Sequence, residues 1–407
     1  MLMEIIKLII PIIILLVLLL LKVELSISIL TGGIILSLIF GLSVSEILKL
    51  TLSAAIAPDT LQLLTIIFMV LLLGRILKAK ESLKIFVEAT ERILKKKSLI
   101  ISFSPALIGL LPMPGGALVS APILNETLEN DSVSPELKTY INFWFRHIWE
   151  YIWPLYPGLI LTVGIFKVDF VSLFKHQFYF TILAIIIGGF FMKIYLPELK
   201  NNKIKPQPFW KNILQFVSGL WEILLIIAIV MIFKIKVYIS ITIVVLFSFI
   251  ILRKTLKEKI KILKTSIKPS ILLTIIAVMI FKSYILHSDV ILITKKLIMG
   301  AGSYKFLIMF FVPFIIGFLT GVNSAFAGIS FPLFISIVGT HNPDMWKIMY
   351  LYVSGFSGVL LSPVHFCFVL SAQYFKAKIK DVYKYLLPSV LIIIAISTVF
   401  FILMERG

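Results

Sequence analysis

Long runs of apolar residues, separated by short polar and basic segments, make up most of the chain. Such runs predict transmembrane helices, because a helix needs about 20 consecutive apolar residues to cross a bilayer. We expect spans at 5–21, 25–42, 58–78, 138–165 and 177–196, and again at 211–233, 237–252, 269–286, 347–372 and 385–404. The pattern therefore predicts an all-α polytopic membrane protein.

Two further apolar stretches are interrupted near their middle and predict re-entrant hairpins. The first, 98–130, is broken by two prolines and two glycines within 112–116. Proline cannot continue a helix, because it lacks an N–H and clashes with the preceding turn. The second stretch, 304–338, is broken at 320–324. Non-helical backbone is tolerated at membrane depth only where protein covers it or water fills a cavity, so the two tips predict a cavity.

The two halves of the chain repeat one plan: three spans, a hairpin, a broken span and a last span. The spans at 138–165 and 347–372 are the broken helices, interrupted at Pro154 and Pro363. The segment LIGLLPMPGGALVSAP of the first hairpin aligns with IIGFLTGVNSAFAGISFP of the second. The shared order of elements predicts an internal duplication.

Each half holds five full spans, an odd number, so the two repeats are predicted to be inverted in the membrane. We assign the first repeat to 1–196, a cytoplasmic linker to 197–210 and the second repeat to 211–407. Most of the 39 lysines and arginines then fall in loops on one face, which the positive-inside rule makes cytoplasmic. We expect a multi-pass protein of the cytoplasmic membrane with both termini outside.

Composition excludes several other classes of protein. The formal net charge of +19 does not indicate a nucleic-acid partner, because the basic residues lie in loops between apolar spans. The single cysteine, Cys367, argues against a disulfide framework and against a cysteine-based metal cluster. No spacing resembles a zinc motif, a phosphate-binding loop or a Ser-His-Asp set. We expect neither an enzyme nor a bound cofactor or metal, apart from a coupling ion.

The two hairpin tips hold the first candidate site residues. A helix that begins near the middle of the membrane directs unpaired N–H groups and a positive dipole end at whatever lies there. We assign Gly115 and Gly116 of the first tip to substrate binding. Polar groups near a helix break suit a coupling ion such as Na⁺, so four residues of the second tip are assigned to ion binding: Thr320, Gly321, Asn323 and Ser324. Alternatively, these residues only permit tight turns and cap the second arm.

Ionisable residues inside the broken spans are the second set of candidates. Arg146, His147 and Glu150 lie within five positions of one span, although a charged residue at a helix centre costs about 2.5–3.5 kcal/mol on insertion scales. Arg146 and Glu150 share one helical face and can pair. The matching segment of the second half contributes Ser362 and His365. We assign all five residues to substrate binding; the alternative is an internal ion pair that touches no substrate.

The segment LIGLLPMPGGALVSAPILNE resembles the signature of an uncharacterised prokaryotic integral-membrane family within the ion transporter superfamily. That superfamily also holds gluconate permeases, citrate and dicarboxylate symporters and the arsenite pump. The resemblance implies inverted five-span repeats with opposed hairpins, a homodimeric scaffold and an elevator-like movement. In the dicarboxylate branch a Ser-Asn-Thr motif at each tip binds Na⁺ and a substrate carboxylate. Val322-Asn323-Ser324 resembles this motif in part, whereas Met113-Pro114-Gly115 departs from it.

These observations predict an elevator-type secondary active transporter that is coupled to Na⁺ or H⁺. Its expected substrate is a small organic anion, either a carboxylate or a sugar acid, and it is expected to be a homodimer. A passive anion channel is one alternative. A membrane-embedded enzyme that uses His147 or His365, for instance in acyl transfer, is another. An enzyme predicts a single catalytic group of residues, whereas the sequence shows duplicated breaks.

Overall fold

The computed structural model describes residues 2–94, 96–110, 115–199 and 208–406. Helices form most of these ranges, and no strand occurs within them. The predicted all-α architecture is therefore confirmed. Of the linker predicted at 197–210, residues 200–207 lie outside the described ranges, and α11 begins at Phe209.

The helices of the first half overlap the predicted spans, although the last of them begins at Phe170 rather than at 177. They are α1 (Leu2–Leu20), α2 (Leu25–Ile39), α3 (Val44–Ala55), α4 (Pro58–Ala79), α5 (Ser82–Leu94), α6 (Lys97–Gly109), α7 (Ala117–Thr127), α8 (Pro135–His147), the 3₁₀ turn η1 (Ile148–Tyr151), α9 (Pro157–Phe166) and α10 (Phe170–Tyr195). Pro58, Pro135 and Pro157 each occupy the first turn of a helix. The N–H that proline lacks has no intrahelical partner there, so these prolines start helices without cost.

The second half follows the same order of elements. It comprises α11 (Phe209–Ile232), α12 (Val237–Ile251), α13 (Leu256–Ser266), α14 (Pro269–Leu286), α15 (Val290–Gly300), the 3₁₀ turn η2 (Gly302–Tyr304), α16 (Lys305–Thr320), α17 (Asn323–Val338), α18 (Met345–Leu361), α19 (Phe366–Phe375) and α20 (Ile379–Arg406). The corresponding helices α3 and α13 both begin with a capping box, Ser43 with Glu46 and Thr255 with Glu258. Hydrogen bonds from Ser43 and Thr255 hold the pKa of these two carboxyl groups below their usual values.

Fewer helices than predicted are long enough to cross a membrane. Within the described ranges, seven helical segments meet this condition: Met3–Leu20, Pro58–Ala79, Phe170–Tyr195, Phe209–Ile232, Pro269–Leu286, Met345–Phe375 and Ile379–Glu405. Helices α2 and α12 have 15 residues each, or about 22 Å of helix against a hydrocarbon core of about 30 Å. The apolar run at 25–42 overestimates α2 because the chain leaves the helix at Phe40 and turns at Gly41, where φ is +85°. The first broken span divides into α8 and α9, each too short to cross alone.

Corresponding helices of the two halves make corresponding contacts. Helix α2 packs on α14 while α12 packs on α4, and α3 packs on α14 while α13 packs on α4. Each hairpin contacts both broken spans: α6 packs on α8 and α7 on α19, whereas α16 packs on α18 and α17 on α9. A reciprocal exchange of partners is what two copies of one plan produce when a two-fold axis relates them.

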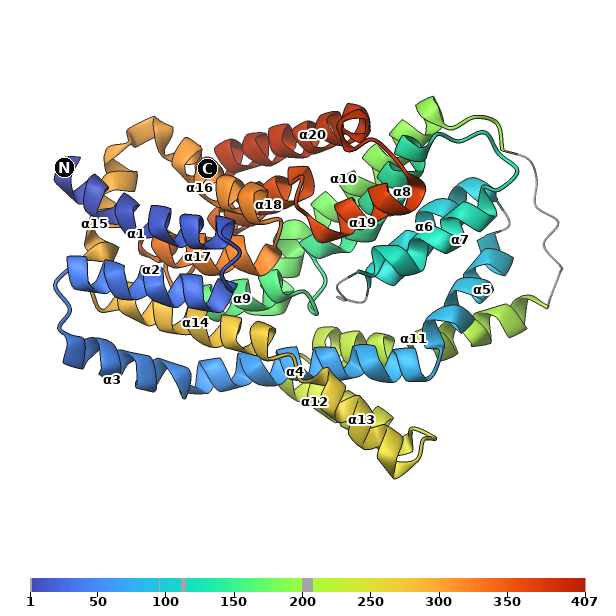
Figure 1. The fold of residues 1–407 in the computed structure, drawn as a ribbon, viewed down its shortest axis with the longest axis horizontal. Coiled ribbons are helices and arrows are strands. Elements are labelled where there is room, and N and C mark those ends of the chain that lie inside the picture. The colour runs from blue at the N-terminus through green and yellow to red at the C-terminus, as the bar shows by residue number, and fades with distance from the viewer. Residues whose placement is uncertain (1, 95, 111–114, 200–207, 407) are drawn as a thin grey trace.

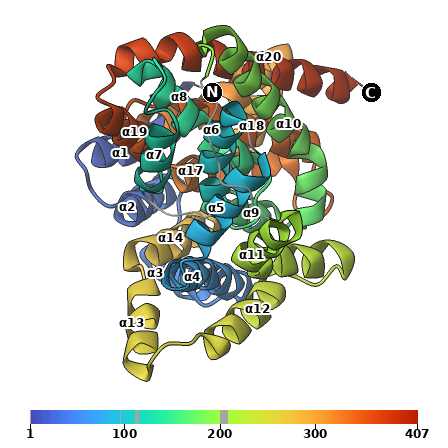
Figure 2. The ribbon, with the colours of Figure 1, turned by 90° about the vertical axis from the view of Figure 1, so that its right-hand side faces the viewer.

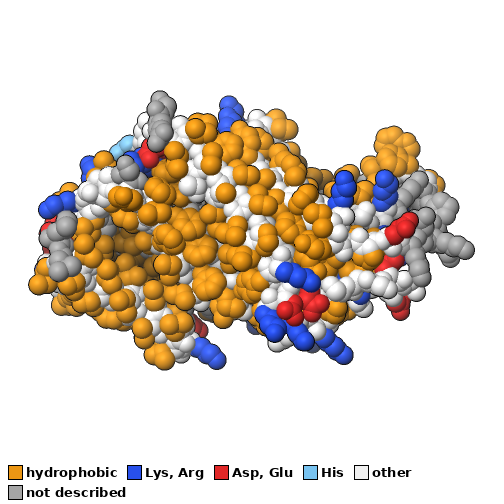
Figure 3. Space-filling model, turned by 90° about the horizontal axis from the view of Figure 1, so that it is seen from above, with side chains coloured by type: hydrophobic (Ala, Val, Ile, Leu, Met, Phe, Trp, Pro, Cys, Tyr) orange, Lys and Arg blue, Asp and Glu red, His pale blue; other side chains and the backbone are white. Residues whose placement is uncertain are grey.

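The views of the whole molecule place the hairpins relative to one another and to the surface. In Figure 1, α6 and α7 approach the centre from the right, α16 and α17 approach it from the left, and both chain ends lie toward the left. Figure 2 looks along the long axis of the molecule, and its lower part is formed by α3, α4, α12 and α13. Hydrophobic side chains cover most of the middle of the face in Figure 3, and charged side chains gather nearer its margins. Such an apolar band suits contact with lipid.

Candidate functional site

Both hairpins pack backbone to backbone against a broken span. Helix α6 ends at Gly109, where a Cβ atom would overlap the carbonyl oxygen of Arg146 in α8. In the second half, a Cβ atom on Gly317 of α16 would overlap the carbonyl oxygen of Gly355 in α18. Only glycine permits so close an approach at 109 and 317. The same contact therefore holds each hairpin against its broken helix.

Aromatic side chains from the first break bind the free end of α6. The Tyr156 hydroxyl donates to the carbonyl of Gly109, and Trp153 Nε1 donates to the carbonyl of Leu110 at 2.7 Å. The last carbonyl groups of a helix have no intrahelical partner, so these two bonds satisfy groups that would otherwise be buried unpaired. Tyr156 and Trp153 thereby fix the first tip to the first break. The breaker residues predicted at 112–114 lie outside the described residues.

The Arg146 side chain is directed at the first hairpin tip. It is 2% exposed, and a Cβ atom on Gly116 would overlap its guanidinium group. Gly116 is the N-cap of α7, and Gly115 has a φ of +77°, in the region that favours glycine. The structure thus brings Arg146 and Gly116 together, 30 positions apart in the sequence. Positive charge converges here from the guanidinium and from the N-terminal end of α7.

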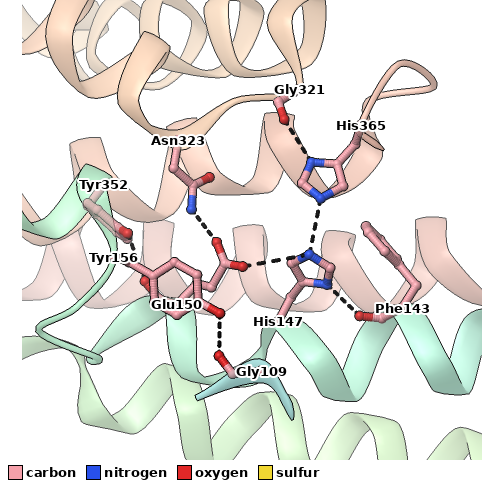
Figure 4. A network of polar contacts seen from close by, with 9 residues as sticks. All are labelled: Gly109, Phe143, His147, Glu150, Tyr156, Gly321, Asn323, Tyr352 and His365. Carbon is pink, nitrogen blue, oxygen red and sulfur yellow. Dashed lines mark hydrogen bonds and ion pairs between the residues drawn. The ribbon is translucent and has the colours of Figure 1, made fainter. Parts of the chain in front are cut away.

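Glu150 links the first half of the chain to the second (Figure 4). Glu150 lies in η1, and its side chain is buried. Asn323, the first residue of α17, donates a hydrogen bond from Nδ2 to Glu150 Oε2. His147 Nε2 lies 3.6 Å from Oε1, and the Tyr352 hydroxyl donates to the Glu150 carbonyl at 2.7 Å. The spacing from Arg146 predicted a pair along one α-helical face. Helix α8 instead ends at His147, and the tighter 3₁₀ turn rotates Glu150 toward the second hairpin tip.

Two histidines from opposite halves meet beside Glu150 (Figure 4). His147 Nε2 and His365 Nε2 lie 3.1 Å apart, and both rings are buried. His147 Nδ1 contacts the carbonyl oxygen of Phe143, and His365 Nδ1 lies 2.8 Å from that of Gly321. The Cys367 Sγ atom and the nearest ring nitrogens of both histidines all lie within 4.8 Å of one another. The sequence analysis did not assign Cys367 to the site. Its position two residues after His365, at the start of α19, could have indicated that it lies close to that histidine.

Buried side-chain oxygens near the second tip remain without a hydrogen-bond partner and can bind an ion. Asn323 Oδ1 is buried and has no hydrogen-bond partner among the described residues. Ser362, which was predicted to bind substrate, is the fully buried C-cap of α18, and its hydroxyl oxygen likewise has no partner among the described residues. Asn323 also packs against α9, since a Cβ atom on Gly158 would lie 3.0 Å from its Cβ. Ser324 is partly buried in the first turn of α17.

The other two predicted ion ligands are used by the local structure. The Thr320 hydroxyl donates to the carbonyl of Ile316 in its own helix at 2.7 Å. Gly321 ends α16 with a φ of +64°, and a Cβ atom there would lie 2.9 Å from the backbone of His365. Its carbonyl oxygen accepts from His365 Nδ1. Thr320 and Gly321 therefore shape the second tip and seat it against the second break.

A further buried carboxylate lies apart from these tips. Glu222 in α11 is fully buried, with Lys80 Nζ 2.6 Å from Oε1 and the Ser248 hydroxyl donating to the same oxygen at 2.8 Å. This pair ties α11 and α12 to the C-terminal end of α4.

Comparison with known protein families gives a match over nearly the whole chain. A family model described as "Protein of unknown function (DUF401)" matches residues 4–404. No match is found among curated proteins. The matched range includes both hairpins and both broken spans.

Proposed function

We propose that the chain, which belongs to the DUF401 family along nearly its whole length, is a secondary active transporter for a small organic anion in the cytoplasmic membrane. The observation that carries this proposal is the hydrogen bond from Asn323 to Glu150, which joins the second hairpin tip to the first break inside one buried polar cluster. Substrate sites of secondary transporters are commonly built where discontinuous helices of inverted repeats meet. The reciprocal helix contacts support such repeats at 1–196 and 211–407.

The positive charge at the first tip supports an anionic substrate. A buried guanidinium is costly inside a membrane, so its placement against the N-cap of α7 favours a role in binding. Arg146 can present two parallel N–H donors to a carboxylate, which a lysine cannot reproduce. A carboxylate or a sugar acid beside Arg146 and the Gly115–Gly116 tip would meet both the guanidinium and the helix end.

The second tip supports coupling to an ion. Asn323 Oδ1 and Ser362 Oγ are buried oxygens with no partner among the described residues, and both suit Na⁺. Glu150 lies between Asn323 and His147 and offers a site for a proton instead. The coupling ion in our proposal is therefore Na⁺ or H⁺.

The movement that we propose carries both hairpins and both broken spans past the remaining helices of a homodimer. The resemblance of residues 107–126 to the ion transporter superfamily implies this elevator-like mechanism. Single cysteines in place of Ser98 and Thr340, at the outer ends of the two hairpins, test the predicted topology. Labelling of the two positions from opposite sides is expected, and labelling of both from one side contradicts inverted hairpins.

Uptake by reconstituted vesicles tests the transport proposal itself. Purified protein in liposomes should accumulate a radiolabelled carboxylate above its external concentration when an inward Na⁺ or H⁺ gradient is imposed. Asn323→Ala should abolish this accumulation, whereas Asn342→Ala, in the exposed loop before α18, should preserve it. Equilibration without accumulation would instead identify a passive channel. No uptake of any carboxylate or sugar acid under either gradient would overturn the proposal.

A further inference from the structure

His147 and His365, which come from opposite halves of the chain, direct the lone pairs of their Nε2 atoms at each other. A carbonyl oxygen can only accept a hydrogen bond, so the Nδ1 atoms that contact Phe143 and Gly321 must both carry hydrogen. In a neutral imidazole the other nitrogen, Nε2, is then an acceptor. His147 Nε2 and His365 Nε2 nevertheless lie 3.1 Å apart. Two acceptors at this distance repel each other unless a cation lies between them.

Two more electron-pair donors lie near these nitrogens. The Cys367 Sγ atom belongs to a group with both ring nitrogens in which every pair of atoms is within 4.8 Å. Glu150 Oε1 lies 3.6 Å from His147 Nε2. Cys367 is 7% exposed, and the other three residues are also buried. Two imidazole nitrogens and one sulfur therefore converge inside the protein, and a carboxylate oxygen lies beside the His147 nitrogen.

We propose that His147, His365 and Cys367 bind a transition-metal ion of the zinc class, with Glu150 as the fourth ligand. Zn²⁺ takes this mixture of ligands in tetrahedral geometry, with Zn–N distances of about 2.0–2.1 Å. Two nitrogens at such a site lie about 3.3 Å apart, close to the separation of the two Nε2 atoms. A proton shared between the rings would relieve their repulsion but would leave the convergence of the thiol and the carboxylate unexplained.

The surroundings of the four side chains fit a metal site. A metal-bound histidine usually donates its other N–H to a carbonyl or carboxylate, which fixes the ring. Both rings have such a carbonyl partner, in Phe143 and Gly321. The second carboxylate oxygen of Glu150 accepts from Asn323, which leaves Oε1 for the ion. Glu150 and His147 come from the first half and His365 and Cys367 from the second, so the ion would join the two breaks.

Metal binding by the purified protein tests this site without any transport assay, so it can fail while the proposed function stands. Protein stripped with a chelator is titrated with Co²⁺, and the charge-transfer absorption of the thiolate–Co²⁺ bond is recorded. One ion per chain is expected. Cys367→Ser should remove the absorption, and both Cys367→Ser and His365→Gln should weaken binding at least about tenfold. His287→Gln, at an exposed histidine after α14, should bind as the unaltered protein does.

Thermal unfolding gives a second measurement that does not depend on the absorption. Zn²⁺ should raise the unfolding temperature of the unaltered protein and of His287→Gln, and should raise that of His365→Gln clearly less at the same Zn²⁺ concentration. The proposal is overturned if folded protein binds no stoichiometric Co²⁺ or Zn²⁺. It is also overturned if Cys367→Ser binds either ion as tightly as the unaltered protein.

Discussion

The hydrogen bond from Asn323 to Glu150 allows a direct measurement of how strongly the two halves are coupled. Asn323→Ala removes the amide and leaves Glu150 Oε2, on a side chain that is 4% exposed, without this donor. Hydrogen bonds to charged groups contribute about 1.5–3 kcal/mol to stability. We therefore expect Asn323→Ala to lower the free energy of unfolding by about 2 kcal/mol. The Glu150 side chain keeps its contact with His147 in this variant.

A double-mutant cycle separates this bond from the general effect of truncating either residue. Glu150→Ala removes both acceptor oxygens of the side chain, and Asn323→Ala/Glu150→Ala completes the cycle. Reversible unfolding in mixed micelles should give a coupling free energy above about 1 kcal/mol. Asn342→Ala, in an exposed loop, should change stability by less than about 0.5 kcal/mol. Single-variant effects that add to within about 0.5 kcal/mol would refute the bond that carries the proposed function.

Three further predictions concern the first tip and the Glu222 pair. Gly109→Ala should destabilise the protein by about 1–3 kcal/mol in thermal unfolding, because its Cβ would overlap the carbonyl oxygen of Arg146. The control variant, Gly189→Ala, places its Cβ more than 4 Å from any other atom and should be neutral or slightly stabilising. Arg146→Lys should leave the protein folded and weaken carboxylate binding at least about tenfold, measured as thermal stabilisation by the ligand. If the ligand stabilises Arg146→Lys as much as the unaltered protein, Arg146 does not bind substrate. Lys80→Ala should destabilise the protein by about 3 kcal/mol, because Glu222 is left buried without its ion pair, and adding Glu222→Gln should recover most of this loss in the same unfolding assay.

The sequence by itself determined where most of the helices lie along the chain and which residues start several of them. Pro58 and Pro269 open α4 and α14 as predicted, and the glycines near 116 and at 321 lie where the hairpin arms meet. These signals are local, since hydrophobic run length and the missing N–H of proline act within one or two turns of the chain. The repeated order of elements could be recognised for the same reason. The run length was misleading where an apolar residue lies in a turn, as at Phe40, and where a helix continues into more polar sequence, as α10 does by beginning at Phe170.

Only the tertiary structure decided which site residues meet. The spacing of Glu150 predicted only a pair with Arg146, four positions away, whereas its contact with Asn323, 173 residues along the chain, depends on the 3₁₀ turn after α8 and on the packing of α17. His147 and His365 are 218 residues apart, and they meet because α8 packs directly on α19. No periodicity encodes such a pairing, since it depends on how preformed helices pack across the two halves. Candidate residues could therefore be predicted one by one, whereas their arrangement into a single cluster required the packed fold.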